Sequence, residues 1–251
     1  MTLLGVGVSG AGATSAGGNS TLGRIGSGYT YADWFGQIQY QSPNFNGFQV
    51  TAAIVEPTSN GVDTNRNNVG YEAKATYDFS ANDVNGRIWL GGISKHHDAG
   101  LASTNGVNGY TAYGAEIGAK ASVAGFGVVG YYYDGKGIDG QLATGGLRYA
   151  NGFKTDDNGG YVQGTYVLPG VGTKLGVSWG RNTSEGRVGA IDGEIKNTSW
   201  IVGAYHPLTK HLNLVAEWTN QEIELDARTT GASANGKVES DTLSAGAILF
   251  F

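Results

Sequence analysis

The stretch GKVESDTLSAGAILFF, residues 236–251, decides the fold class. From Leu243 onward every second residue is apolar, and these residues share one face of an extended strand because successive side chains alternate sides. Thr242 and Ser244 begin a polar face. The chain then stops on the aromatic Phe251 with no polar tail, which is typical of a strand that meets lipid on one face and carries an aromatic belt at the membrane boundary. The stretch predicts the last strand of an antiparallel transmembrane β-barrel.

Further strand-like segments precede this one, each bounded by turn residues. The composition agrees with many strands and turns, since the chain has 44 Gly, 14 Tyr and only 4 Pro. The sequence therefore predicts an all-β protein with eleven visible strands. Their expected ranges are 31–41, 47–56, 67–79, 86–95, 110–123, 125–134, 159–168, 173–181, 194–207, 212–225 and 237–251.

Apolar and polar residues alternate most clearly in the segment 67–79, and the segments 110–123, 173–181 and 212–225 repeat the pattern. The segments 86–95 and 125–134 are ambiguous in phase. A lysine placed against lipid at mid-bilayer would cost about 2–4 kcal/mol, so the polar faces are expected to line a water-filled interior. The alternative is the solvated face of an ordinary soluble sheet. The predicted lining residues are Glu72, Lys74, Asp78, Glu116, Lys120, Lys174 and Glu217.

The connections between these segments alternate in length. Short links are expected at 42–46, 80–85, 124, 169–172 and 208–211, and Asn46-Gly47 and Asn85-Gly86 are dipeptides suited to tight hairpins. Long polar loops are expected at 57–66, 96–109, 135–158, 182–193 and 226–236. Turns at one end and long loops at the other are typical of an outer-membrane barrel. Eleven is an odd number, and single-chain bacterial barrels have an even one, so we expect either that strands are missing from the N-terminus or that 1–30 contain one.

Composition excludes several other classes of protein. The net charge of −5 offers no basic field for nucleic acid, and the absence of cysteine removes disulfides, thiolate metal sites and cysteine nucleophiles. No run of eighteen apolar residues is present, so a transmembrane helix is not expected. His96-His97-Asp98 does not predict a metal site, because adjacent residues of an extended chain point in opposite directions. No catalytic residues, metal or cofactor are expected.

Three separated motifs then identify a family. They are YQSPNFNGF at 40–48, YHPLTK at 205–210 followed by AEW at 216–218, and the terminal Phe251. In this order they resemble the general diffusion porins of Gram-negative outer membranes. The resemblance implies a sixteen-stranded, trimeric outer-membrane channel for passive diffusion of small hydrophilic solutes and ions. It implies that 31–251 are strands six to sixteen of the barrel, that 1–30 are part of the inward-folding constriction loop, and that the first five strands and the signal peptide are absent.

The resemblance also implies sites and partners. Arg24 is the only charged residue in 1–32, and Asp33 stands where many relatives place an arginine of the channel wall, so these two residues are expected at the constriction. Phe251 is expected to act as the C-terminal signal for barrel insertion. The implied partners are outer-membrane lipid, lipopolysaccharide, the barrel-assembly machinery and further copies in a homotrimer. Two alternatives remain open, namely a structural or adhesive barrel with a plugged lumen and an outer-membrane barrel hydrolase.

Overall fold

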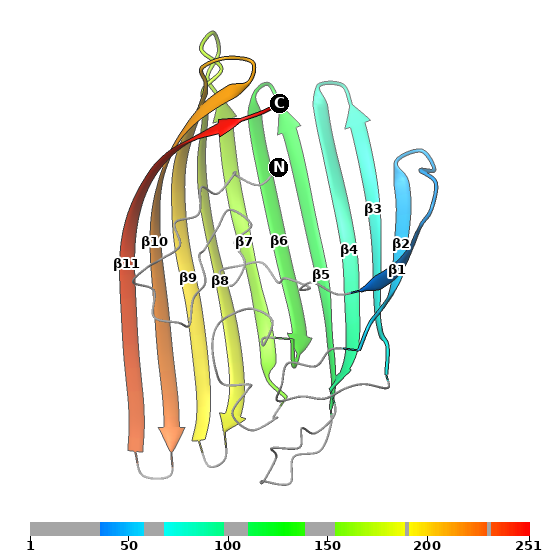
Figure 1. Cartoon of the computed structure of the whole chain (residues 1–251), viewed down its shortest axis with the longest axis vertical. Coiled ribbons are helices and arrows are strands. Elements are labelled where there is room, and N and C mark those ends of the chain that lie inside the picture. Colours follow the sequence, from blue (N-terminus) through cyan, green and yellow to red (C-terminus); the bar gives the residue numbers. More distant parts are fainter. Residues whose placement is uncertain (1–35, 58–67, 98–109, 139–153, 189–190, 230–231) are drawn as a thin grey trace.

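A computed structural model describes residues 36–57, 68–97, 110–138, 154–188, 191–229 and 232–251. These residues form one antiparallel sheet of eleven strands in sequence order (Figure 1). Over the described ranges there is no helix that has the length and apolar character needed to cross a membrane. The strands are β1 (Gln37–Gln41), β2 (Phe48–Val55), β3 (Gly70–Ala81), β4 (Val84–His97), β5 (Tyr110–Val123), β6 (Phe126–Lys136), β7 (Asp156–Val167), β8 (Lys174–Val188), β9 (Ile191–Pro207), β10 (Leu212–Thr229) and β11 (Ala232–Leu249).

The sheet curls around a hollow but does not close. Each strand pairs with the next along the chain, and among the described strands β1 and β11 each have a single neighbour. The turns that follow β1, β3, β5, β7 and β9 all lie at one end, called here the short-turn end, at the top of Figure 1. This architecture confirms the expected all-β fold with eleven antiparallel strands.

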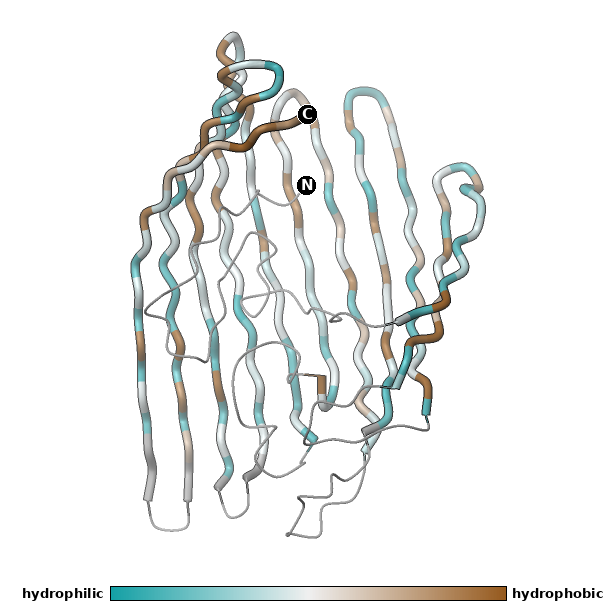
Figure 2. The backbone as a smooth tube through the Cα atoms, viewed as in Figure 1, coloured by the Kyte–Doolittle hydropathy of each residue, from teal (hydrophilic) through white to brown (hydrophobic). Residues whose placement is uncertain are grey.

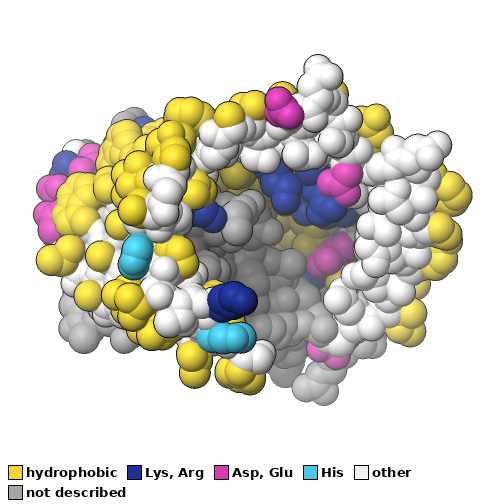
Figure 3. Space-filling view, turned by 90° about the horizontal axis from the view of Figure 1, so that it is seen from above, with side chains coloured by type: hydrophobic (Ala, Val, Ile, Leu, Met, Phe, Trp, Pro, Cys, Tyr) yellow, Lys and Arg dark blue, Asp and Glu magenta, His cyan; other side chains and the backbone are white. Residues whose placement is uncertain are grey.

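The two faces of the sheet differ in chemistry. Tyr71 and Tyr77 of β3 are 58% and 47% exposed on one face, and Ile117 of β5 and Val128 of β6 are similarly exposed. Glu72 and other charged residues lie on the opposite face, because side chains alternate along each strand. We call the apolar face the outer face and the opposite one the inner face. Hydropathy alternates along the backbone in Figure 2, and Figure 3 shows apolar side chains outside and charged side chains around the hollow.

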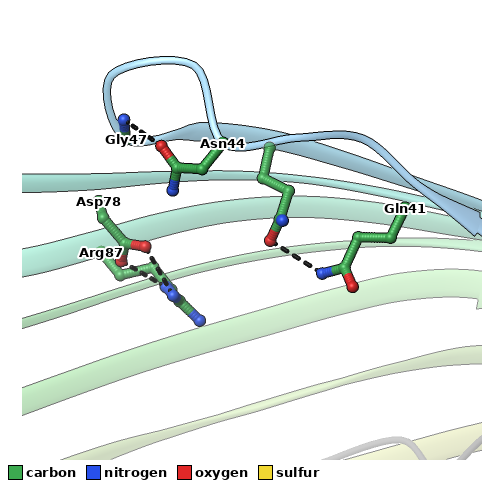
Figure 4. A network of polar contacts seen from close by, with 6 residues as sticks. Gln41, Asn44, Gly47, Asp78 and Arg87 are labelled. Atoms are coloured by element: carbon green, nitrogen blue, oxygen red, sulfur yellow. Dashed lines mark hydrogen bonds and ion pairs between the residues drawn. The ribbon is translucent and has the colours of Figure 1, made fainter.

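Of the two predicted turn dipeptides, one forms a turn and the other does not. Asn46 and Gly47 have positive φ angles of 52° and 95°, and the Gly47 amide donates to Asn44 Oδ1 over 2.7 Å (Figure 4). The predicted turn at Asn85-Gly86 is wrong, because both residues lie inside β4 and the positive φ falls on Asn82. A Cβ atom on Gly86 would come within 2.2 Å of the Phe79 ring on the neighbouring strand. This glycine therefore makes room for an aromatic ring.

Two of the predicted long loops are also wrong. Most of 182–193 and 226–236 belongs to paired strands, with the register of β8 and β9 continuing to Val188↔Ile191 and that of β10 and β11 to Thr229↔Ala232. The sequence pattern fails here because both faces carry polar residues, and without an apolar face a strand shows no alternation. The strands β8 to β11 consequently extend further than the other strands at the end opposite the short turns, called here the long-loop end (Figure 1).

Candidate functional site

The register assembles the inner face into rows that run across the strands. Asp78, Arg87 and Lys120 are direct partners on β3, β4 and β5. Further toward the long-loop end, Lys74, Gly91 and Glu116 form a second row on the same strands. Direct partners have Cβ atoms about 4.5–5.5 Å apart, so each row is a line of interacting side chains. The inner face of β3 to β5 is therefore a charged wall.

An ion pair crosses this wall over a glycine. Lys74 Nζ donates to Glu116 Oε1 over 2.7 Å, although the two residues lie two strands apart. Gly91 stands between them, and a Cβ at this position would lie 2.9 Å from Glu116 Cγ and from its Oε1. The hydroxyl of Tyr131 donates to the other carboxylate oxygen over 2.8 Å. Glu116 is thus fixed by a charged donor on one side and a neutral donor on the other.

Aromatic rings lie flat against the same wall. Trp89 covers Gly118, its direct partner on β5, and a Cβ on this glycine would come within 2.1 Å of the indole. Trp89 stacks on Tyr131 with ring centroids 6.4 Å apart, and Tyr131 contacts Tyr161 at 5.5 Å. Lys74 Nζ lies 5.8 Å from the centre of the Trp89 ring, at the favourable limit for a cation–π contact. Glycine partners allow large rings to cover the wall without projecting into the hollow.

A second ion pair lies nearer the short-turn end. Arg87 donates from Nε and from a terminal nitrogen to the two carboxylate oxygens of Asp78, both over 2.6 Å (Figure 4). This bidentate geometry is the strongest form of an arginine–carboxylate pair. It occupies both oxygens of Asp78, so the carboxylate is largely compensated where it faces the hollow.

The inner face of β7 to β9 carries mainly neutral amides and hydroxyls instead, with Lys174 at the start of β8 and Asp157 in β7 as charged residues. Asp157 is 2% exposed, and it accepts from the Thr155 hydroxyl (2.8 Å), the Ser184 hydroxyl (2.7 Å) and the Ile138 amide (2.9 Å). Three donors of this kind satisfy a buried carboxylate. The buried neutral groups are Gln163, Ser178, Asn182, Ser184, Asn197 and Ser199.

Glu217 has a different environment from the other predicted lining residues. It is 5% exposed, and the hydroxyl of Tyr205 on β9 donates to its carboxylate. The Tyr205 side chain reaches it by lying over Gly203, where a Cβ would be 2.8 Å from the tyrosine hydroxyl. Lys174 lies on the same face, with Tyr205 as its direct partner. Glu217 is therefore held within the wall of the sheet.

All seven predicted lining residues lie on strands of the sheet, on the inner face. Arg24 and Asp33 lie outside the described residues. Phe251 is exposed and follows β11, which ends at Leu249. The sequence-based assignment missed Arg87, Trp89 and Tyr131, because the phases of β4 and β6 are ambiguous in the hydropathy pattern. The pairing of Arg87 with Asp78 across a short hairpin is the signal that would have fixed the phase of β4.

The described part of the chain offers no cluster of metal ligands. It contains no group of three or more His, Asp or Glu side chains placed to hold a metal ion. His96, from the His96-His97-Asp98 sequence, has Nδ1 3.2 Å from the Thr111 hydroxyl. The site that the geometry defines is an extended polar surface, with fixed charges on β3 to β5 and neutral hydrogen-bonding groups on β7 to β9.

Comparison with known proteins agrees with this architecture. The sequence model of the family described as Gram-negative porin matches residues 2–226. A crystal structure of the outer membrane channel DcaP of Acinetobacter baumannii has a TM-score of 0.63 and 19% sequence identity, over 90% of this chain and 64% of that one. The siderophore receptor PiuA of the same organism has a TM-score of 0.49 and 11% identity, over 85% of this chain and 44% of its own.

A search of curated protein sequences finds no match. The likeness to DcaP shows the fold, and this chain spans 64% of the DcaP chain. The family model, which extends over most of the sequence, shows the family. The chain belongs to the Gram-negative porins, and it is a protein of the outer membrane.

Proposed function

We propose that the chain forms the wall of a water-filled channel through which small hydrophilic solutes and ions diffuse passively. The observation that carries the proposal is the two-sided sheet, which exposes apolar residues such as Tyr71 and Ile117 outside and holds charges around a hollow inside (Figure 3). Such a distribution suits lipid on one face and water on the other. Membership of the porin family supports the same function. The proposed mechanism has no catalytic step.

The lining residues define what the channel discriminates. We propose that Glu72, Lys74, Asp78, Glu116, Lys120 and Lys174 face the water-filled passage, with Glu217 held in the wall beneath it. A fixed charge in a narrow passage acts on ions at short range, so pore width and these charges set the ion preference. In the Lys74–Glu116 pair, side-chain exposures of 42% and 16% make the ammonium the more accessible member.

Planar-bilayer recording tests the channel. The folded protein is expected to give discrete conductance steps. If bilayers with verified insertion show no such steps, the proposal is overturned in favour of a plugged barrel. Glu116→Gln is expected to shift the reversal potential in a salt gradient toward anion preference, because Lys74 then loses its counter-charge. The double variant Lys74→Met/Glu116→Gln is the matched control, since it removes both charges and is expected to return toward the parent value.

The constriction is proposed from the family resemblance. We infer that 1–30 form part of an inward-folding loop, that 31–251 form the barrel wall, and that Arg24 and Asp33 contribute to the field at the narrowest point. A reversal potential for Arg24→Ala equal to that of the parent would contradict this assignment.

The same resemblance supports a homotrimer in contact with outer-membrane lipid and lipopolysaccharide, inserted by the barrel-assembly machinery with Phe251 as its signal. The native mass of the assembled protein tests the homotrimer. The rate at which Phe251→Ala is inserted by the barrel-assembly machinery tests Phe251 as the signal.

A further inference from the structure

A long apolar recess crosses the outer face near the short-turn end, on the side of the sheet opposite the charged wall. Its volume is about 770 Å³, and its lining residues come from strands between β5 and β11. Val128, Val177 and Leu243 line it, and all three are strongly exposed on the outer face. The recess therefore opens away from the proposed passage, on the side where contact with outer-membrane lipid is proposed.

Small residues of the outer face form part of the lining. Gly164 of β7 lines the recess, and a Cβ on this glycine would have no atom within 4 Å beyond its chain neighbours. Ala204 and Ala216 also line it, and they are direct partners on β9 and β10. From β7 to β10 the recess crosses three inter-strand spacings, or about 14 Å. It is thus an elongated space that follows small residues across several strands.

Large apolar side chains also line the recess. Tyr166 of β7 stacks on its direct partner Phe126 of β6, with ring centroids 4.2 Å apart. Trp218 of β10 has Leu243 of β11 as its direct partner. All four residues belong to the lining. An occupant would therefore make apolar contacts with aromatic and aliphatic side chains as well as with the floor.

A polar pair lies at the short-turn side of the recess. His206 is the next outer-face residue after Ala204 on β9, about 7 Å further toward the short turns. Its Nδ1 atom lies 2.9 Å from the Thr173 hydroxyl oxygen. Within the described part of the chain, Nε2 of His206 has no hydrogen-bond partner. When the hydroxyl donates to Nδ1, the ring proton is on Nε2, which can then donate to an acceptor outside the protein.

The surroundings of this pair favour an anionic acceptor. The short turns at 167–173 and 207–211 contain no Asp or Glu, and Lys210 is exposed in the second of them. Short turns of outer-membrane barrels lie on the periplasmic side, where the membrane leaflet consists of phospholipid. A phosphate headgroup that continues into acyl chains matches a polar pair beside an apolar recess. A second copy inserted in the same direction would bring the same turns to this end, and with them no carboxylate for Nε2.

We propose that this recess binds one phospholipid of the periplasmic leaflet, with an acyl chain along Gly164, Ala204 and Ala216 and the phosphate accepting a hydrogen bond from His206 Nε2. Apolar area removed from the surroundings on several sides of the chain, together with a hydrogen bond to a charged acceptor, distinguishes this lipid from the other lipids around the wall. The proposal rests on the proposed contact with outer-membrane lipid, and it does not depend on conduction through the passage.

Native mass spectrometry of the full, folded chain in detergent micelles counts bound lipid during titration with phosphatidylglycerol. The parent is expected to bind one molecule. Gly164→Leu is expected to weaken binding about tenfold, because the new side chain occupies the recess and excludes about two methylene groups of the lipid. Gly130→Leu is the matched control. Its Cβ also has open space around it, but Gly130 lies on β6 outside the recess, so binding is expected to stay unchanged.

The headgroup contact is tested with His206→Phe, which keeps an aromatic ring and removes the nitrogen donor. This change is expected to weaken the binding of phosphatidylglycerol about tenfold, the equivalent of one lost hydrogen bond to a charged group. Diacylglycerol has the same acyl chains and no phosphate. Its binding is expected to be weaker than that of phosphatidylglycerol in the parent and equal in the parent and in His206→Phe.

The outcomes separate the lipid site from the channel. Lipid binding that Gly164→Leu weakens and Gly130→Leu does not supports the recess, and it would stand even if planar bilayers showed no conductance. Equal affinity of the parent and Gly164→Leu overturns the site and leaves a conducting channel intact. Loss of subunits from the native mass of Gly164→Leu at unchanged lipid binding also overturns it, because a second copy would then fill the recess. Unchanged phosphatidylglycerol binding by His206→Phe overturns the headgroup contact. Heat-dependent electrophoretic mobility verifies that each variant is folded before it is scored.

Discussion

Glycine acts at the scale of single residues by admitting large side chains to the wall. Gly118 and Gly86 lie opposite Trp89 and Phe79, and Gly91 lies beneath the Lys74–Glu116 pair. In each case a Cβ would collide with the ring or with the carboxylate side chain. A sequence pattern cannot distinguish these glycines from turn glycines, because the reason for them lies on the neighbouring strand. For this reason Asn85-Gly86 predicted a turn that lies instead at Asn82-Asp83.

Gly118→Val tests this role. The new side chain would need the space of the indole, which a Cβ already approaches to 2.1 Å, so Trp89 must leave the wall. Overpacking of this kind typically costs about 1–3 kcal/mol. Urea titration of the protein folded in lipid vesicles is expected to show the loss. Gly130→Ala is the matched control, because nothing lies within 4 Å of a Cβ there, and equal destabilisation by the two changes would contradict the argument.

A surface ion pair gives a prediction about pH. Lys237 Nζ lies 2.7 Å from a Glu222 carboxylate oxygen, beyond the apolar part of β10 and β11. The hydrogen bond from Lys237 lowers the pKa of Glu222 below its usual value. A lowered pKa in the folded state means that the pair contributes stability above the unfolded pKa of about 4.3 and loses it as the pH falls through the folded value.

Carbon-13 NMR of labelled glutamate in micelles measures this effect. Glu222 is expected to titrate below the usual glutamate range in the parent and to return to that range in Lys237→Met. An unchanged Glu222 titration in the variant would show that the ammonium does not stabilise the carboxylate. Lys237 is exposed and Glu222 partly exposed, so the effect of the pair is also expected to fall with added salt.

At the scale of strands, the sequence predicts the ends of a strand well where one of its faces is apolar. It predicts them poorly where both faces of the strand carry polar residues. The range 110–123 was predicted correctly at both ends, because its apolar face is continuous. By contrast, the sequence predicts loops where the ends of β8 to β11 continue as paired strands. Residues such as Glu222 and Lys237 place charges on both strands of this hairpin, and the hydropathy period disappears although the backbone pairing continues.

Hydrogen exchange distinguishes strand from loop in this region. Amides of 182–185 in β8 lie in a strand paired with both β7 and β9, so they are expected to exchange slowly. The tight turn at Ala124-Gly125, with φ angles of 48° and 84°, provides the fast reference within the same molecule. Exchange in 182–185 as fast as at this turn would restore the loop assignment.

At the scale of the whole molecule, the sidedness of the sheet was predictable from the sequence and the fine structure of the inner face was not. Alternation along the strand places Glu72 and Lys74 on the face opposite Tyr71. The cost of a lysine against lipid then assigns the Lys74 face to the interior. The segregation of charges on β3 to β5 from neutral groups on β7 to β9 depends on which rows the register aligns. The register becomes known only when the turns are located, and one of them was misplaced.

One pair of lysine substitutions tests sidedness directly. Ala216 is exposed on the outer face of β10, between Leu214 and Trp218, and Thr219 lies on the inner face of the same strand. Ala216→Lys is expected to cost about 2–4 kcal/mol of folding free energy in vesicles, since it places an ammonium against hydrocarbon. Thr219→Lys adds the same charge where water can solvate it, so its cost is expected to be much smaller. Denaturant titration of both variants in the same vesicles measures the difference, and equal costs, or a larger cost for Thr219→Lys, would mean that the apolar face of this sheet does not meet lipid.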